Sequence, residues 1–149
     1  MSRIDFAFGA EDRLRMACRT AARHADAGRR LLVYCTDPRR MRRFDALLWS
    51  FEPASFVTHA AVGDPLAAEA AVLLAAGPEA LDEAVHEGWL LNLDLDCPPG
   101  AGRFERVLEI VSGHEADIAA ARHRWLAYKA EGHELRAHDL AAGNLGAAS

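Results

Sequence analysis

Two carboxylates close an apolar run in the middle of the chain. Asp94 and Asp96 stand at the end of residues 89–95, which we predict to be a strand. Open α/β sheets bind ligands at the carboxyl ends of their strands, and two carboxylates there would suit Mg²⁺. No Lys, Ser or Thr at a matching position completes a phosphoryl-transfer set, so a solvated strand end is the simpler interpretation.

Glycine-containing turns are the second candidate for chemistry. Residues 100–105 keep two of the three glycines of a dinucleotide fingerprint, but Glu105 stands where the third belongs. The loop of residues 9–12 has one glycine and two carboxylates, which would repel a phosphate. A small nucleotide-binding enzyme or sensor that uses Asp94, Asp96 and the Gly100 turn is therefore the alternative function, and not the first.

Metal and nucleophile motifs give no further candidates. The seven histidines (positions 24, 59, 86, 114, 123, 133 and 138) form no HxxxH or HExxH pair. Cys18, Cys35 and Cys97 lie far apart and form no CxxC pair, which is typical of small apolar residues in a reducing compartment. No GxSxG motif occurs. We expect no cofactor, no metal and no catalytic residue, and therefore a protein that is not an enzyme.

Two surfaces are better candidates for binding than for catalysis. In the last predicted helix, Arg122, Trp125, Leu126 and Lys129 fall within roughly one 100° arc. Two cations beside two large apolar groups suit a peptide that presents both a carboxylate and an aromatic side chain. The pattern also fits a helix whose Trp125 and Leu126 face the core while the cations form a solvated rim.

The second surface follows four arginines, Arg39, Arg40, Arg42 and Arg43, at the start of a predicted helix. Cations there oppose the helix dipole, so they are either tolerated by solvent or used by a partner. The aromatic residues that follow are core or a docking patch, and the pattern leaves both open. They are Trp49, Phe51 and Phe56.

The elements that would position these groups alternate along the chain. We predict strands at residues 3–8, 31–35, 72–75 and 89–95, and helices at 12–27, 38–49, 78–86 and 115–131. A short extended piece is expected at 55–59, and residues 104–111 read as either helix end or strand. Such alternation predicts one α/β domain, residues 1–140, with a mainly parallel sheet covered by helices on both faces. A polar, small-residue segment would follow Gly132, leaving His133 and His138 without regular structure, and residues 141–149 would form a flexible C-terminal tail.

Composition sets the class of protein. The 149 residues are 51% hydrophobic and 26% charged, which is typical of one globular domain. Apolar runs are too short to span a bilayer, and Arg3 and Asp5 interrupt any signal sequence, so we expect a cytoplasmic protein. The net charge of -5 disfavours broad, nonspecific attachment to nucleic acid, so we expect little direct nucleic-acid binding. The same charge counts against a third possible function, a module that binds single-stranded DNA directly through its arginines.

Three segments of the chain match motifs of one known protein family. The first is GRRLLVYC at residues 28–35, with FDALLW at 44–49 ending the next helix; the second, PASFVTH at 53–59, is similar to that family's SFVPH stretch. The third, RHRWLAYK at 122–129 followed by Gly132, is similar to its closing R-x-R-Y-K-x-Y-R-x-x-G run. By these three segments the chain resembles the chi subunit family of the bacterial DNA polymerase III clamp loader. The resemblance covers nearly the whole chain and implies a Rossmann-like fold without nucleotide chemistry.

The resemblance also implies a partner for the last helix, which in that family captures the acidic, Phe-ending C-terminal tail of single-stranded DNA-binding protein. Arg122 would hold the terminal carboxylate, Trp125 would stand where the family has Tyr, and Val111 would help form an apolar floor. Leu126 replaces a family Lys, and Lys129 and Arg124 would partly supply the missing charge.

A second partner is implied for the opposite surface, where the family binds the psi subunit or a DNA-repair helicase. Trp49, Phe56 and Thr58 occupy those positions, with Thr where the family motif has Pro. The resemblance therefore implies a non-catalytic accessory subunit that joins a clamp loader to other proteins.

Overall fold

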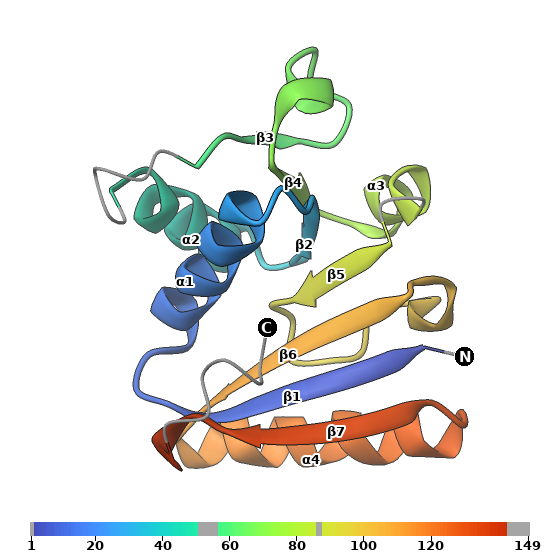
Figure 1. The fold of residues 1–149 in the computed structure, drawn as a ribbon. Helices are drawn as coiled ribbons and strands as arrows, with labels where there is room; N and C mark the ends of the chain where they lie inside the picture. The colour runs from blue at the N-terminus through green and yellow to red at the C-terminus, as the bar shows by residue number, and fades with distance from the viewer. Residues whose placement is uncertain (1, 51–56, 86–87, 143–149) are drawn as a thin grey trace.

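Seven parallel strands form one sheet in the order β3-β4-β2-β5-β6-β1-β7 (Figure 1). The computed structural model describes residues 2–50, 57–85 and 88–142. The strands are β1 (Arg3–Ala10), β2 (Leu31–Tyr34), β3 (His59–Ala61), β4 (Val72–Ala75), β5 (Trp89–Asn92), β6 (Arg106–Ser112) and β7 (Glu134–Asp139). The helices are α1 (Arg13–Asp26), α2 (Pro38–Ser50), α3 (Pro78–Glu83) and α4 (Glu115–Ala130).

Helices cover both faces of this sheet. Apolar side chains of α1 and α2 pack with Leu31, Val33 and Leu108 on one face. Those of α3 and α4 pack with Ile4 and Val107 on the other. The three-layer α/β fold predicted from the alternating pattern is thus confirmed, and every strand is parallel to its neighbours.

Most elements lie where the sequence predicts them. Asp12 accepts hydrogen bonds from the amides of Leu14 and Arg15, which caps α1 at its expected start. Residues 104–111, which read equally as helix or strand, provide most of β6. The predicted strand at 89–95 is shorter than expected and ends at Asn92, because the chain then turns toward Asp94. The expected extended piece at 55–59 overlaps residues 51–56, which lie outside the described part of the chain.

The region after Gly132 differs from our expectation of a polar tail without regular structure. It forms β7, which pairs with β1 from Arg3↔Glu134 to Phe8↔Asp139. An edge strand pairs with only one neighbour, so β7 needs few apolar residues. Leu135 packs against the core, and most of the other residues of β7 are polar. The short helix Leu140–Ala142 follows, and residues 143–149 of the predicted flexible tail lie outside the described residues.

A buried carboxylate also ties β7 to the sheet. The Nε2 atom of His138 lies 3.1 Å from Oδ1 of Asp5, and Arg106 and Arg3 reach the same carboxylate. Burial alone would raise the pKa of Asp5, but the His138 hydrogen bond and the two guanidinium groups lower it below its ordinary value. Among the described residues, no helix is long and apolar enough to cross a membrane.

Candidate peptide-binding pocket

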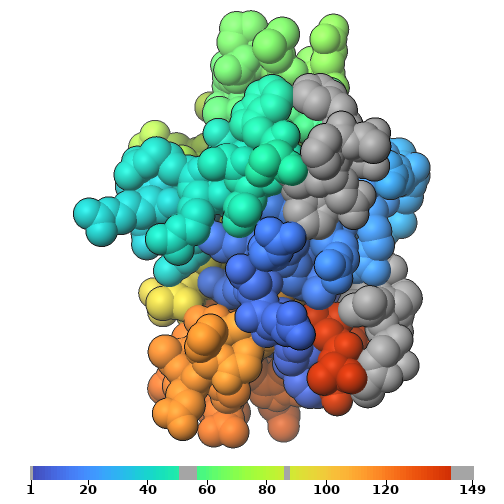
Figure 2. Space-filling model, turned by 90° about the vertical axis from the view of Figure 1, so that its left-hand side faces the viewer, coloured from blue at the N-terminus to red at the C-terminus, as the bar shows by residue number. Residues whose placement is uncertain are grey.

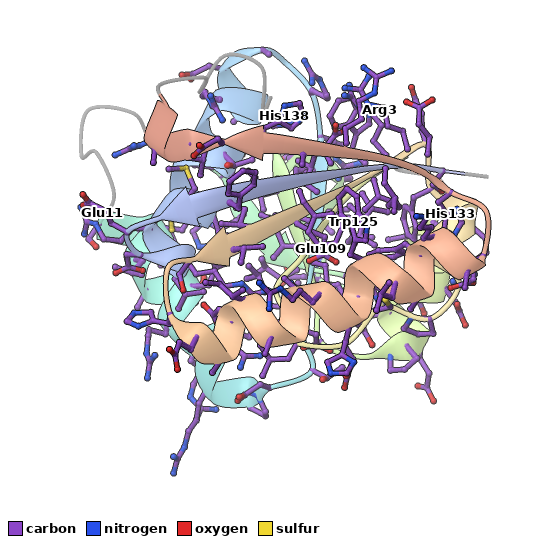
Figure 3. The ribbon with its side chains drawn as sticks, turned by 90° about the horizontal axis from the view of Figure 1, so that it is seen from below. Arg3, Glu11, Glu109, Trp125, His133 and His138 are labelled. Carbon is purple, nitrogen blue, oxygen red and sulfur yellow. The ribbon has the colours of Figure 1, made fainter. Side chains whose placement is uncertain are left out.

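A buried ion pair sets the orientation of α4 against the sheet. Glu109 of β6 is fully buried, and the Nε atom of Arg124 donates to its Oε1 at 3.0 Å. Arg124 also donates to the carbonyl of Leu95 at 2.8 Å. Because the Arg124 side chain must reach Glu109 beneath the helix, the side chains of Arg122 and Trp125 are turned toward the edge of the sheet. Figure 3 shows Glu109 and Trp125 between α4 and the strands.

Further hydrogen bonds satisfy the second oxygen of this carboxylate. The hydroxyl of Tyr128 donates to Oε2 of Glu109 at 2.6 Å, and the amide of Asn92 donates to it at 2.9 Å. Burial raises the pKa of Glu109 above its ordinary value, while Arg124, Tyr128 and Asn92 act in the opposite direction. The whole network lies inside the protein, so its role is to hold α4 in place.

Aromatic rings fill the space between α4 and β1. The ring of Phe6 lies 5.2 Å from that of Trp125 and 6.0 Å from that of Tyr128, centroid to centroid. Tyr128 is fully buried, whereas Trp125 is only partly covered. The uncovered part of the Trp125 indole is therefore available to a ligand at the edge of the sheet.

That edge contains a hollow of about 340 Å³. Its walls come from β1, β6, β7 and α4, which lie side by side in Figure 1. Almost all of its lining is apolar, and Arg122 is the cation among the described lining residues. The lining consists of Phe6, Phe8, Gly9, Val111, Ser112, Gly113, Ile118, Ala121, Arg122, Trp125 and Ala137.

Two local backbone features border this hollow. Gly9 has a φ of 85° at the irregular end of β1, a conformation that residues with a Cβ rarely adopt. The hydroxyl of Ser112 donates to Asp117 and accepts from the amide of His114, which fixes the start of α4. The side chain of Arg122 is exposed and makes no ion pair or hydrogen bond with any residue that the structure describes, so it can bind an anion.

The structure brings together three of the six residues that the sequence assigns to this site. Val111, Arg122 and Trp125 all line the hollow. Arg124 does not, because its guanidinium group is 2% exposed and pairs with Glu109. Leu126 and Lys129 are exposed on α4 outside the lining, with Leu126 63% exposed.

Sequence reasoning missed the contributions of β1 and of the edge strand β7. Phe6 and Phe8 both line the hollow from β1, and Ala137 lines it from β7. The alternation of Phe6 and Phe8 was a usable signal, since residues two apart point to the same face of a strand. Ala137 gave no such signal, because β7 itself was not predicted.

The residues assigned to a second partner lie away from the pocket. Trp49 is 60% exposed near the end of α2, and its ring lies 4.8 Å from that of His59. Thr58 is exposed, and its hydroxyl accepts from the amide of Ala71. Phe56 lies outside the described residues. Trp49 and Thr58 thus lie on the side of the molecule that carries β3, at the opposite edge of the sheet from β7.

Of the two carboxylates that first suggested chemistry, that of Asp94 is engaged in structural contacts. Asp94 accepts from the amide and the hydroxyl of Thr36 at 2.7 and 2.8 Å, and lies 4.0 Å from Arg40. Asp96 is exposed. At Gly100 an added Cβ would meet the guanidinium group of Arg103, which folds over the turn. This turn is therefore covered by a side chain and does not offer bare amides to a phosphate.

Cysteine and histidine side chains add no reactive centre in the part of the chain that the structure describes. Burial raises the pKa of Cys18 to about 12 and that of Cys97 to about 11, so these thiols stay protonated near neutral pH. Burial lowers the pKa of His24 to about 4, which keeps its ring neutral beside Trp89. No group of three His, Cys, Asp or Glu residues in the described chain is placed to hold a metal ion.

Comparisons with known proteins identify the family. The protein-family model described as "DNA polymerase III chi subunit, HolC" matches residues 1–136 of this chain. A curated relative named DNA polymerase III subunit chi, from Pseudomonas aeruginosa, is 32% identical over 144 residues, covering 94% of this chain and 98% of the relative. A relative of the same name from Escherichia coli is 28% identical over 120 residues, covering 80% of each chain. The chain therefore belongs to the DNA polymerase III chi subunit family.

Proposed function

We propose that this chi subunit is a non-catalytic, cytoplasmic accessory subunit of the clamp loader, and that its α4 pocket binds the acidic, Phe-ending C-terminal tail of single-stranded DNA-binding protein. The observation that carries the proposal is the hollow in which Val111, Trp125 and Arg122 meet. It offers an apolar cavity and an adjacent cation, which are the two features that a C-terminal Phe requires.

The chemistry of a terminal Phe matches each part of this pocket. Its phenyl ring would enter the hollow against Phe6, Val111 and Trp125, where burial of an aromatic side chain stabilises binding by about 2–3 kcal/mol. Its carboxylate would then lie at the rim, where the guanidinium group of Arg122 can donate two parallel hydrogen bonds. A Phe inside a sequence lacks this carboxylate and would lose the second contact.

Acidic residues before the Phe would lie over the exposed face of α4. Lys129 is exposed there and would attract them, while Leu126 offers apolar surface in place of the charge that the family carries at this position. We expect micromolar affinity, roughly -8 kcal/mol. Added salt should weaken the binding, because exposed charges are screened.

Titration of a fluorescent peptide that carries the acidic, Phe-ending tail tests this proposal. Arg122→Ala should weaken binding by about tenfold or more, since a hydrogen bond to a charged group contributes about 1.5–3 kcal/mol. The matched control is Arg136→Ala, which removes an exposed arginine that pairs with Glu134 away from the pocket. Equal weakening by both variants, or no binding by the wild type, would contradict the proposal.

We further propose that Trp49, Thr58 and Phe56 form the surface for a second protein, either a psi subunit or a DNA-repair helicase. The 60% exposure of Trp49 supports this, because large exposed aromatic side chains are enriched at interfaces. Trp49→Ala should abolish co-elution with the partner in gel filtration while leaving tail binding unchanged. Retained co-elution with both candidate partners would exclude this surface.

A further inference from the structure

Positive charge is concentrated in the first third of this acidic protein. Residues 1–50 carry eleven of the seventeen Lys and Arg side chains but only six of the twenty-two Asp and Glu side chains. Their formal net charge is therefore +5, although the whole chain has -5. The net charge alone argued against contact with nucleic acid, but it does not describe the two helices that these residues form.

Five arginines project from α1 and α2 without partners. None of their guanidinium groups forms an ion pair or a hydrogen bond with another residue in the described chain. We call this set the arginine face, and its members are Arg15, Arg19, Arg39, Arg42 and Arg43, all of them exposed. The two helices lie together on one side of the molecule, and side chains of α2 project furthest from it (Figure 2).

The two helices contribute to adjoining hollows around the start of α1. One hollow, of about 370 Å³, is lined by Arg43 and Arg40 of α2 together with Asp12. The other, of about 560 Å³, is lined by Arg15 and Arg19 and also by Asp12. Because both hollows share Glu11 and Asp12, Arg43 of α2 borders the same surface as Arg15 and Arg19 of α1, while Arg39 and Arg42 are exposed on α2 outside both linings.

Carboxylates on this surface neutralise only part of its charge. Asp12 accepts from the amides that begin α1, and Asp37 accepts from the amides of Arg39 and Arg40 at the start of α2. Asp45 lies 2.7 Å from His59. Glu11 is exposed and lines both hollows, and Asp117, which accepts from Ser112, lines the first. These two carboxylates reduce the positive charge there without an ion pair to any of the five arginines in the described chain.

We propose that the arginine face binds the phosphate backbone of single-stranded nucleic acid, independently of base sequence. The guanidinium fork matches phosphate oxygens, and every cation of the face is Arg. Arg15 and Arg19 lie one helical turn apart, so a strand with one charge at each repeat can contact them in succession. This inference goes beyond the proposed tail binding and does not depend on it.

A nucleic acid fits this surface better than an acidic protein does. Protein partners are generally anchored by large apolar or aromatic side chains in fitted pockets. Among the large apolar residues that the structure shows as exposed, Leu95 alone lines either hollow. The α4 pocket, by contrast, has an almost wholly apolar lining and a single cation. Among the described residues, Leu95 is thus the one exposed large apolar side chain of the two hollows, and the exposed Trp49 lies at the other end of α2.

Fluorescence anisotropy with labelled oligo(dT) of about 30 nucleotides tests this proposal. Five phosphate contacts predict a slope of about -3.5 for log K against log salt, and about a hundredfold loss of affinity between 50 and 200 mM salt. Arg15→Gln/Arg19→Gln and Arg42→Gln/Arg43→Gln should each reduce that slope by about 1.4 and weaken binding more than tenfold at about 50 mM salt.

Two controls separate a local site from a general charge effect. Arg103→Gln/Arg136→Gln changes the net charge equally, and these arginines pair with Asp82 and Glu134 elsewhere on the surface. The affinity of this variant for oligo(dT) should lie within about threefold of that of the wild type. The same is expected of Arg122→Ala, which removes the cation of the α4 pocket. Circular dichroism would verify that each variant is folded.

Three results would overturn the proposal. The wild type could fail to bind oligo(dT) at about 50 mM salt, or the Arg103→Gln/Arg136→Gln control could lose as much affinity as the α1 and α2 variants. Polyglutamate of similar length could also bind as tightly as oligo(dT) and compete with it, which would assign the surface to an acidic protein. A folded Arg122→Ala variant should lose binding of the tail peptide and keep binding of oligo(dT). That result would establish that the two sites are separate.

Discussion

The carboxyl ends of β2 and β5 and the pocket beside α4 differ in how far internal contacts fill them. At the carboxyl edge near β5, where doubly wound sheets usually bind ligands, Asp94 is bound by Thr36 and the turn at Gly100 is covered by Arg103. Beside α4, the hollow is open, and its one cation makes no ion pair within the described residues. The carboxyl ends of β2 and β5 are thus closed by internal contacts, while the hollow beside α4, at the ends of β1 and β6, is open.

This difference explains how an α/β fold can serve as a docking module. A pocket at the sheet edge depends on an added strand, β7, and on a helix held in place by a buried ion pair, Glu109–Arg124. The residues proposed to bind the tail and the residues that hold α4 in place are therefore separate groups. Substitutions in the two groups should have different effects on stability and on affinity.

Breaking the buried ion pair should give the largest effect. Arg124→Met leaves the carboxylate of Glu109 buried without its cation, which should destabilise the fold by about 3–5 kcal/mol. Urea denaturation followed by circular dichroism measures the change. The exposed Arg122→Ala variant serves as control and should change stability by less than about 0.5 kcal/mol. Equal stability of Arg124→Met and wild type would show that the pair does not hold α4.

Filling the pocket should separate binding from stability. Ala137 is exposed and lines the hollow from β7, so Ala137→Phe would occupy the space proposed for the phenyl ring of the ligand. We expect the affinity for the tail peptide to fall about 10- to 100-fold, because burial of the peptide ring is lost. Calorimetric titration measures the affinity, and Ala116→Phe, on an exposed position of α4 outside the lining, is the size-matched control. Undiminished affinity of Ala137→Phe would place the peptide elsewhere.

At the carboxyl edge, a substitution should affect stability alone. Asp94→Asn weakens the contacts with Thr36 and Arg40, and should destabilise the protein by about 1 kcal/mol. Tail affinity should stay unchanged, and nucleotides with Mg²⁺ should not shift the melting temperature of the wild type. A thermal shift with a nucleotide that Asp94→Asn abolishes would instead support the nucleotide-binding alternative, since ligands that bind only the folded state stabilise it.

Sequence patterns predicted the layers of the fold because apolar spacing reports burial directly. The run at residues 31–35 predicted a strand covered on both faces, and β2 is buried throughout. The apolar residues Met41, Phe44, Leu47 and Leu48 recur at the spacing of one helix face, and all four pack in or against the core. Such local periodicity needs no knowledge of which elements become neighbours.

The patterns failed where an interaction between distant segments decides the structure. The strand β7 contains Leu135 as its one large apolar residue, and it forms because β1 offers a free edge and Asp5 accepts from His138. Arg124 reads as a surface cation beside Arg122, yet Glu109 neutralises it within the core. No spacing along the chain reports that β6 and α4 bring these two side chains together.

The most direct test of the tail proposal is a double-mutant cycle between Arg122 and the terminal carboxylate of the peptide. Affinities would be measured for wild type and Arg122→Ala with peptides that end in a free Phe carboxylate or in its amide. We predict that either change alone weakens binding about tenfold or more, and that the second change then adds little, giving a coupling energy of about 1–3 kcal/mol. Independent, additive losses would contradict the account, because Arg122 would then not contact the carboxylate.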